Sequence, residues 1–202
     1  MNTHRYFLVN KPYNMVSQFV STHDVRLLGD LGFNFPEGTH AIGRLDQKSE
    51  GLLLLTTNKK ITKLLFQGPI PHKRTYLVQV KNAMAAETAT KLAGGIEISA
   101  KTGAHFITTP CEVEIVTKPP NLFEMGKPLH ENVITTWLTI TLTEGKFHQV
   151  RKMVAAVNHK CIRLIRVAIE DIQLSDMQPG EVREISEKDF FNKLRLTDNA
   201  YI

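Results

Sequence analysis

Hydrophobic residues follow a strand-like period in one part of the chain and a helix-like period in the next. Residues 134–143 alternate, which predicts a half-buried antiparallel strand with one apolar face made of Leu138, Ile140 and Leu142. Residues 146–157 change to helical spacing and place one apolar stripe on a helix, made of Phe147, Val150, Val154 and Val157. An unbroken leucine run is instead typical of a fully buried strand, and we expect one over residues 51–57.

Apolar runs and turn residues predict the remaining elements in the same way. We expect further strands over residues 5–10, 15–20, 75–80, 162–167 and 169–174, and helices over residues 59–66, 83–93 and 187–194. The stretches 29–39 and 119–131, which contain Gly and Pro, are expected to be loops. Because regular βαβ alternation is scarce, the predicted fold class is α+β, with a mixed, largely antiparallel sheet and flanking helices.

Length and cysteine content bear on the domain organisation and the cellular compartment. A chain of 202 residues suits one domain over residues 1–202, or two lobes of about 1–70 and 71–202 that share a core. The longest apolar run, residues 52–55, is far shorter than the roughly 20 residues that cross a membrane. Cys111 and Cys161 are widely spaced, which fits two small apolar residues in a reducing cytosol. We therefore expect a cytoplasmic protein without membrane contact.

Basic residues gather in two segments that contain no acidic residue. Residues 51–86 hold six lysines and arginines and residues 146–166 hold another six, together 12 of the 25 basic residues and none of the 20 acidic ones. Two such segments on one fold would line a groove for a polyanion such as RNA. On charge alone, two ordinary solvated faces explain the pattern equally well.

The stretch 43–56, with the sequence GRLDQKSEGLLLLT, carries the candidate chemistry. The carboxylate of Asp46 lies two residues from Arg44, glycines bound the pair, and the predicted buried strand follows directly. A rigid element of this kind holds a reactive group in a defined place. Taken by itself, the same arrangement is also explained by a structural ion pair between Arg44 and Asp46.

This stretch and several others resemble motifs of the pseudouridine synthases of the RsuA/RluE family. The other matching segments are residues 10–12, 74–76, 144–153, 163–166 and 179–183. They occur in the family's order, and the resemblance covers nearly the whole chain. Residues 136–138 make the chain most similar to the RluE branch, which modifies large-subunit ribosomal RNA. Many members of the family carry an S4 RNA-binding domain before the catalytic domain, and we expect none here.

The resemblance implies an enzyme that isomerises a uridine of ribosomal RNA, in the 23S rRNA, after the base is flipped out of its stack. The bond from C1′ to N1 breaks, the uracil turns, and C5 takes over the bond, so no cofactor is expected. The catalytic carboxylate of the family corresponds to Asp46, acting as a nucleophile on the sugar or the base, or as a general base.

Two further residues are assigned to this chemistry. Tyr76 corresponds to the family tyrosine that packs on the uracil and is a candidate for removing the C2′ proton. Without the motif, Tyr76 would be read as an ordinary tyrosine of a sheet. Arg151 is our choice for the guanidinium that keeps Asp46 ionised, with a plain phosphate contact as the alternative.

The family also implies contacts with RNA in a central cleft. Arg44 resembles the residue that fills the place of the flipped base or grips the neighbouring phosphate. The other candidates for backbone contacts are Lys11, Lys73, Arg74, His148, Lys152 and Arg163. No histidine spacing suits a metal site, and we expect none.

The expected partner is large-subunit ribosomal RNA, free or in an assembling particle, and the expected state is a monomer. Two rival interpretations stay open at this point. One is a non-catalytic RNA-binding protein that uses the two basic segments. The other is a hydrolase built on Asp46 and a histidine, although no nucleophile-elbow motif supports it.

Overall fold

The structure is a computed structural model that describes residues 4–68, 70–100, 103–126, 129–130 and 132–196. Contacts within the chain divide it into two compact units. Unit 1 is formed by Met1–His72 together with Arg166–Ile202, and unit 2 by Lys73–Ile165. Strand β9 (Cys161–Ile169) begins in unit 2 and ends in unit 1. The predicted lobes differ from these units, because the C-terminal segment returns to unit 1.

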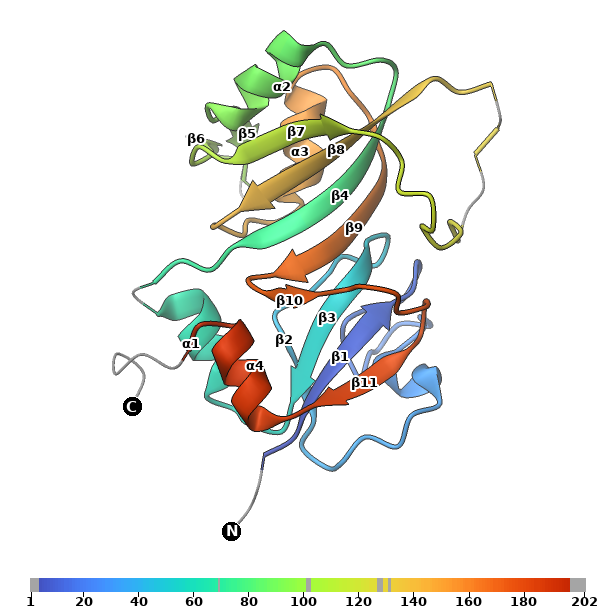
Figure 1. Ribbon diagram of the computed structural model, residues 1–202, viewed down its shortest axis with the longest axis vertical. Coiled ribbons are helices and arrows are strands. Elements are labelled where there is room, and N and C mark those ends of the chain that lie inside the picture. The colour runs from blue at the N-terminus through green and yellow to red at the C-terminus, as the bar shows by residue number, and fades with distance from the viewer. Residues whose placement is uncertain (1–3, 69, 101–102, 127–128, 131, 197–202) are drawn as a thin grey trace. The chain divides into compact units, whose positions relative to one another are not determined.

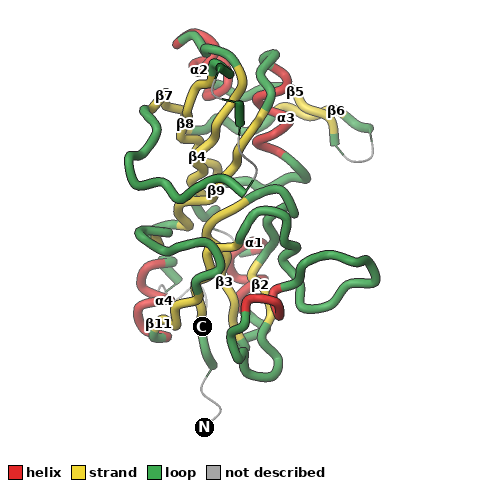
Figure 2. The backbone as a smooth tube through the Cα atoms, turned by 90° about the vertical axis from the view of Figure 1, so that its right-hand side faces the viewer, coloured by secondary structure: helices red, strands yellow, loops and turns green. Residues whose placement is uncertain are grey.

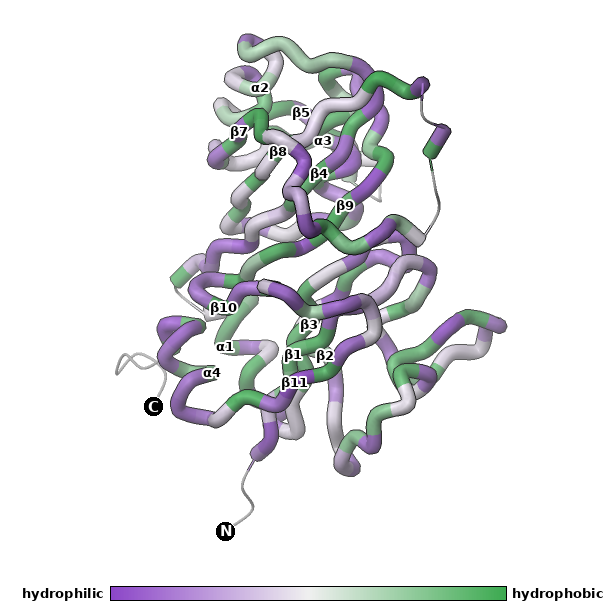
Figure 3. Tube along the Cα trace, turned by 45° about the vertical axis from the view of Figure 1, so that its right-hand side comes forward, coloured by the Kyte–Doolittle hydropathy of each residue, from purple (hydrophilic) through white to green (hydrophobic). Residues whose placement is uncertain are grey.

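Unit 1 is built around antiparallel strands (Figure 1). Strand β1 (Tyr6–Lys11) pairs on one side with β3 (Glu50–Thr56) and on the other with β11 (Val182–Ile185). The short strand β2 (His40–Ile42) also pairs with β3, antiparallel. Every residue of β3 is buried, as the leucine run predicts, and β3 is coloured hydrophobic for most of its length in Figure 3. Each fully buried leucine of this kind stabilises the folded state by about 2 kcal/mol.

Short helices complete unit 1. Helix α4 (Glu187–Lys193) is capped by Ser186, whose hydroxyl accepts a hydrogen bond of 3.1 Å from the backbone amide of Asp189. Its buried Phe190 packs on the ring of Tyr6 in β1, with 4.5 Å between the ring centroids. Helix α1 (Ile61–Gln67) follows β3 closely in the chain, and strand β10 (Ile172–Gln173) pairs with β9.

The connection between β1 and β2 is mostly loop, with one 3-10 turn, η1 (Leu28–Leu31) (Figure 2). Its interior is aromatic: Phe33 and Phe35 each lie 5.6 Å from the ring of Phe7, and Phe35 also contacts Phe19. The strand predicted over residues 15–20 is therefore wrong. Met15 forms only an isolated bridge with Arg26, and the aromatic cluster holds the segment as a folded loop.

Unit 2 contains an antiparallel sheet and two helices on one of its faces. The central strand β8 (Thr135–Leu142) lies between β4 (Arg74–Lys81) and β7 (Glu112–Val116). The helices are α2 (Ala86–Ala93) and α3 (Gln149–Ala156), and a separate hairpin is formed by β5 (Glu97–Ser99) and β6 (His105–Ile107).

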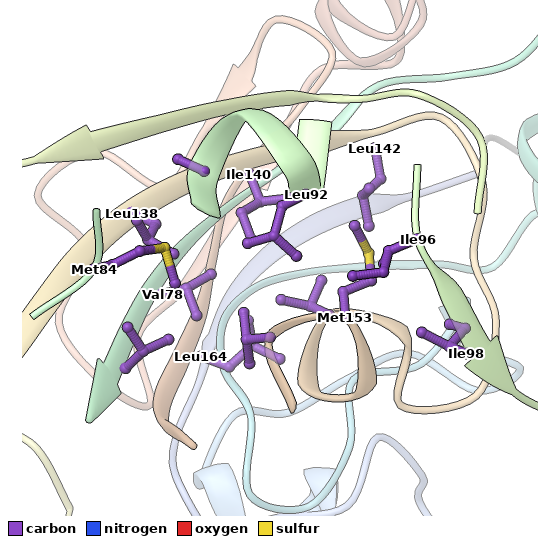
Figure 4. Close-up of a cluster of buried hydrophobic side chains, with 14 residues drawn as sticks. Val78, Met84, Leu92, Ile96, Ile98, Leu138, Ile140, Leu142, Met153 and Leu164 are labelled. Carbon is purple, nitrogen blue, oxygen red and sulfur yellow. The ribbon is translucent and has the colours of Figure 1, made fainter. Parts of the chain in front are cut away.

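A hydrophobic core fills the space between this sheet and its helices (Figure 4). Val78, Leu138 and Ile140 from the strands meet Leu92 of α2 and Met153 of α3, and all five are buried. The predicted apolar face of β8 is confirmed, because Leu138, Ile140 and Leu142 all belong to this core. Strands β2, β5, β6, β7 and β11 were not predicted, since each is only three to five residues long.

The helical stripe predicted over residues 146–157 is partly wrong. Helix α3 begins at Gln149, because the preceding residue, His148, has a left-handed backbone with φ of 54°. Val150 and Val154 face the core as expected, together with Met153. Phe147 precedes the helix and is 52% exposed.

Candidate functional site

The loop that carries Asp46 runs from β2 to β3 and is held firmly on the N-terminal side of Asp46. Gly43 has φ of 71°, and a Cβ atom in its place would lie 2.8 Å from the ring of Phe66 in α1, so only glycine fits. Leu45 is buried, and the hydroxyl of Ser17 accepts from its amide at 3.0 Å and donates to its carbonyl at 2.9 Å. The backbone on the N-terminal side of Asp46 is therefore fixed by packing and by hydrogen bonds.

Asp46 itself is half-buried at the start of the turn into β3. Its carbonyl accepts from the amide of Ser49 at 2.9 Å, and the Ser49 hydroxyl lies 3.5 Å from the carboxylate. Arg44 is exposed and forms no salt bridge with Asp46 in the part of the chain that the structure describes. The interpretation as a structural Arg44–Asp46 ion pair is therefore not supported, and the Arg44 side chain faces solvent.

Lys11 supports the same loop from inside the protein. Its side chain is 0% exposed, and its amine donates to the carbonyls of Pro12 at 2.9 Å, Met15 at 2.7 Å and, at 3.5 Å, Gln47. This burial is at odds with the predicted phosphate contact of Lys11. The amine instead ties the turn after β1 to the residue that follows Asp46.

Burial lowers the pKa of Lys11 to about 7, although the carboxylates of Glu50 and Asp46 oppose this shift. The cations Arg166 and Arg26 also lower it. In the unfolded chain the same amine has its ordinary pKa of 10.5. Between the two values the unfolded state binds a proton that the folded state does not, so this residue makes the protein more stable as pH rises.

We expect Lys11→Met to remove the increase of stability with pH that the lowered pKa of Lys11 causes. The free energy of unfolding of the wild type, measured relative to the variant, should rise by roughly 1.4 kcal/mol per pH unit between about pH 7.5 and 9.5. Urea unfolding at several pH values measures it, and the comparison cancels the groups that both proteins share. A difference that stays constant over this range would contradict the shifted pKa of Lys11.

Tyr76 lies on β4 in unit 2 and is half-buried. It pairs with Ile140 of β8, and its ring packs against the hydrophobic core of the unit. The neighbouring Thr75 and Thr141 share a hydrogen bond of 2.9 Å between their hydroxyls across the same two strands. The ring is therefore supported by rigid structure on its inner side.

Arg151 lies in the first turn of α3, between the core residues Val150 and Met153 of the helix. Its guanidinium donates to the Cys161 thiol at 3.6 Å, and the Cys161 thiol in turn lies 3.6 Å from the carbonyl of Arg163. The side chain is half-buried, as expected for a stem held by packing.

Two of the predicted RNA contacts in unit 2 are buried. Arg74 is 8% exposed and donates to the carbonyl of Thr143 at 2.6 Å. Arg163 is 3% exposed, lies 4.8 Å from the ring centroid of Phe123 and donates to the carbonyl of Glu124 at 3.3 Å. Both guanidinium groups therefore serve the packing of unit 2, which does not fit the predicted phosphate contacts.

The other candidates in unit 2 reach solvent. Lys73 is exposed and forms a 2.7 Å salt bridge with Glu112, a pair that contributes little in water. His148 and Lys152 are half-exposed at the start of α3, and the Lys152 amine donates to the carbonyl of Ser99 in β5 at 2.6 Å. Phe147, which sequence reasoning placed in the core, joins this group on the surface.

The predicted residues thus divide between the two units. Asp46 and Arg44 lie on the loop between β2 and β3 of unit 1, and Lys11 is the last residue of β1 in the same unit. The other seven residues belong to unit 2. Over the described ranges, no group of three or more His, Cys, Asp or Glu side chains is arranged to hold a metal ion. None of the helices in those ranges is long and apolar enough to cross a membrane.

Comparisons with known proteins agree on one family. A family model described as RNA pseudouridylate synthase matches residues 5–156. The chain is 36% identical over 188 residues to the ribosomal large subunit pseudouridine synthase E of Vibrio parahaemolyticus, which covers 92% of this chain and 75% of that protein. It is 29% identical to the ribosomal small subunit pseudouridine synthase A of Escherichia coli, over 92% of this chain and 72% of that protein. A solved pseudouridylate synthase superposes with a TM-score of 0.77 at 26% identity, over 96% of this chain and 75% of that one.

Proposed function

Because the chain belongs to the RNA pseudouridylate synthase family, we propose that it converts one uridine of large-subunit ribosomal RNA to pseudouridine. The substrate follows the relatives that are 36–38% identical, which are named for the large subunit, whereas the relative named for the small subunit is 29% identical. The observation that carries the chemistry is the half-buried Asp46 on a loop that Ser17, Lys11 and Gly43 hold in place.

In this reaction the bond between C1′ and N1 breaks, the uracil rotates, and a bond forms between C1′ and C5. The proton on C5 leaves and a proton is placed on N1, so the product is an isomer of the substrate. Asp46 is the group that attacks the sugar or the base, and its carboxylate must be ionised to do so. The fixed backbone around it favours one orientation of the carboxylate toward the flipped nucleotide.

Tyr76 and Arg151 are assigned to the same reaction. The inner side of the Tyr76 ring rests on the core of unit 2, which suits a residue that stacks on a base. Its hydroxyl oxygen takes the C2′ proton when the C1′–N1 bond breaks, and the proton returns to C2′ when C5 bonds to C1′. Arg151 supplies a positive charge that stabilises an ionised carboxylate. Arg44, Lys73, His148 and Lys152 are the proposed contacts with the RNA backbone, since their side chains reach solvent.

Mapping of pseudouridines tests the proposed function. Ribosomal RNA is compared from cells that have the gene, that lack it, and that carry only the Asp46→Asn form. We expect one pseudouridine of the large-subunit RNA to be lost in the last two strains. Loss from the small-subunit RNA instead would contradict the proposed substrate, and loss of none would contradict the activity.

Replacement of basic residues separates contacts with RNA from structural cations. Affinity for RNA should fall steeply with salt, because each neutralised phosphate releases counterions. We expect Lys152→Gln to weaken binding and to flatten the salt slope by about one unit. Arg163→Gln should leave the slope unchanged and lower the melting temperature, because this guanidinium is buried on Phe123. Equal slopes for Lys152→Gln and the wild type would mean that the RNA follows another path.

A further inference from the structure

Phe147 differs from the other large apolar residues at the surface of unit 2 in its surroundings. It is 52% exposed, and it is an aromatic ring within the segment 146–166, which contains six basic residues and no acidic one. The ring of His148 stacks on it, with 3.9 Å between the centroids and an angle of 15° between the planes. The Lys152 amine lies 5.3 Å from the centroid of the Phe147 ring.

The turn that presents Phe147 is fixed by a buried glutamine. The Gln149 side chain is 4% exposed, accepts from the amide of Lys146 at 2.9 Å and donates to the carboxylate of Glu144 at 2.7 Å. The amide of Gln149 also donates to the carbonyl of Lys146 at 3.1 Å. These bonds bracket Phe147, so its outward direction belongs to the folded backbone and needs no rearrangement on binding.

The hairpin β5–β6 adds a second aromatic ring and another cation to this surface. Phe106 of β6 packs on the core of unit 2, and the Lys146 amine lies 5.8 Å from its ring centroid. Lys152 donates to Ser99 of β5, which joins the hairpin to α3. We call the surface formed by Phe106, Lys146, Phe147, His148 and Lys152 the aromatic platform.

We propose that the aromatic platform binds an unpaired nucleotide of the RNA other than the target uridine, with its base stacked on Phe147 and its phosphate contacted by Lys146 or Lys152. The inference rests on the proposed function and deepens it, because it names a second nucleotide that the enzyme grips. An exposed aromatic ring provides a stacking surface for any base, and the lysines provide the complement to the phosphate. A pocket for an apolar peptide would not require two basic side chains, His148 and Lys152, against the Phe147 ring.

Stacking of a base on Phe147 predicts that the effect of a Phe147 substitution on RNA affinity does not vary with salt. Stacking releases no counterions, whereas a phosphate contact does. Phe147→Leu keeps the apolar contacts with the protein but removes the aromatic face. It should weaken the binding of a single-stranded RNA by roughly 5- to 150-fold at every salt concentration, with the salt slope of the wild type. Phe147→Tyr should restore the affinity.

The experiment measures the binding of an oligouridylate of about 12 nucleotides that carries 5-iodouridine, by fluorescence anisotropy and by photo-cross-linking mapped with mass spectrometry. The matched control is Ile134→Ala, which removes another exposed apolar side chain of unit 2, 69% exposed. A cross-link at Phe147, an affinity loss in Phe147→Leu that does not vary with salt, and wild-type affinity in Ile134→Ala together support the platform.

Other results would overturn it. Wild-type affinity in Phe147→Leu, an equal loss in Ile134→Ala, or a flattened salt slope in Phe147→Leu would each exclude stacking on Phe147. If Phe147→Leu binds RNA like the wild type but no longer binds an acidic peptide such as oligoglutamate, which the wild type binds, the surface would be assigned to a protein partner. Tritium release from ribosomal RNA labelled at C5 is measured separately on the wild type, so failure of the platform and failure of the proposed reaction are distinguished.

Discussion

Asp46→Asn is expected to reduce the formation of pseudouridine by at least roughly 10⁴-fold, the scale that follows the removal of a catalytic nucleophile. The substitution keeps the size of the side chain and removes its charge and its nucleophilic oxygen. Folding should be preserved, because Ser17, Lys11 and Gly43 hold the loop through contacts that do not involve the Asp46 carboxylate. Tritium release from RNA labelled at C5 of uridine measures the activity.

The matched control is Asp24→Asn, which makes the same chemical change at an exposed carboxylate of the loop between β1 and β2. We expect it to react at the wild-type rate. RNA affinity should be nearly equal for the wild type and both variants. Substantial turnover by Asp46→Asn, or an equal loss in Asp24→Asn, would refute the role of Asp46. RNA binding by a wild type that never releases tritium would instead favour the interpretation as a non-catalytic RNA-binding protein.

Tyr76→Phe is expected to reduce single-turnover rates by about 10²- to 10⁴-fold, the usual effect of losing a general base. The ring that packs on the core of unit 2 is retained, so neither the stability of unit 2 nor the affinity for RNA should change. Tyr76→Leu should impair binding as well, since stacking of a base on an aromatic ring is worth roughly 1–3 kcal/mol. Rates are measured on a saturating RNA fragment, and affinities are taken from separate titrations.

Tyr13→Phe serves as the matched control, because Tyr13 is a half-exposed tyrosine of unit 1 that has no assigned role. It should react like the wild type. If Tyr76→Phe also reacts at the wild-type rate, then Tyr76 is only a stacking surface and another group removes the C2′ proton. An intermediate that accumulates in Tyr76→Phe, but not in Asp46→Asn, would place Tyr76 after Asp46 in the reaction.

The sequence by itself identified the segments in which one local rule decides the structure. The leucine run of β3 and the alternation of β8 predicted buried strands, because the apolar period sets which face of an extended chain is covered. The stretch 43–56 likewise indicated Asp46 as the candidate reactive group and contained the glycine that its loop requires. Gly43 shows why: its positive φ and the ring of Phe66 leave no room for a side chain. Ordered motifs then led to the family without any knowledge of the fold.

Only the tertiary structure decided which basic residues are exposed. Nothing in the neighbouring sequence distinguishes the buried basic residues Lys11, Arg74 and Arg163 from Lys73 and Lys152, which reach solvent. A cation becomes buried when carbonyl groups or rings from distant segments surround it, as Met15 and Gln47 surround Lys11 and as Phe123 covers Arg163. No window along the chain contains that information.

The course of the C-terminal segment and the exposure of Phe147 have the same kind of cause. Strand β11 pairs with β1, so that Tyr6 lies opposite Ile185, and this long-range pairing returns the segment to unit 1. Helical spacing predicted that Phe147 would be buried, on the assumption that the helix had already begun. The left-handed backbone of His148 and the buried side chain of Gln149 start α3 at Gln149, three residues later than predicted, and turn Phe147 outward. Periodicity assigns a face only once the first residue of the element is known, and here that residue is set by hydrogen bonds of the folded chain.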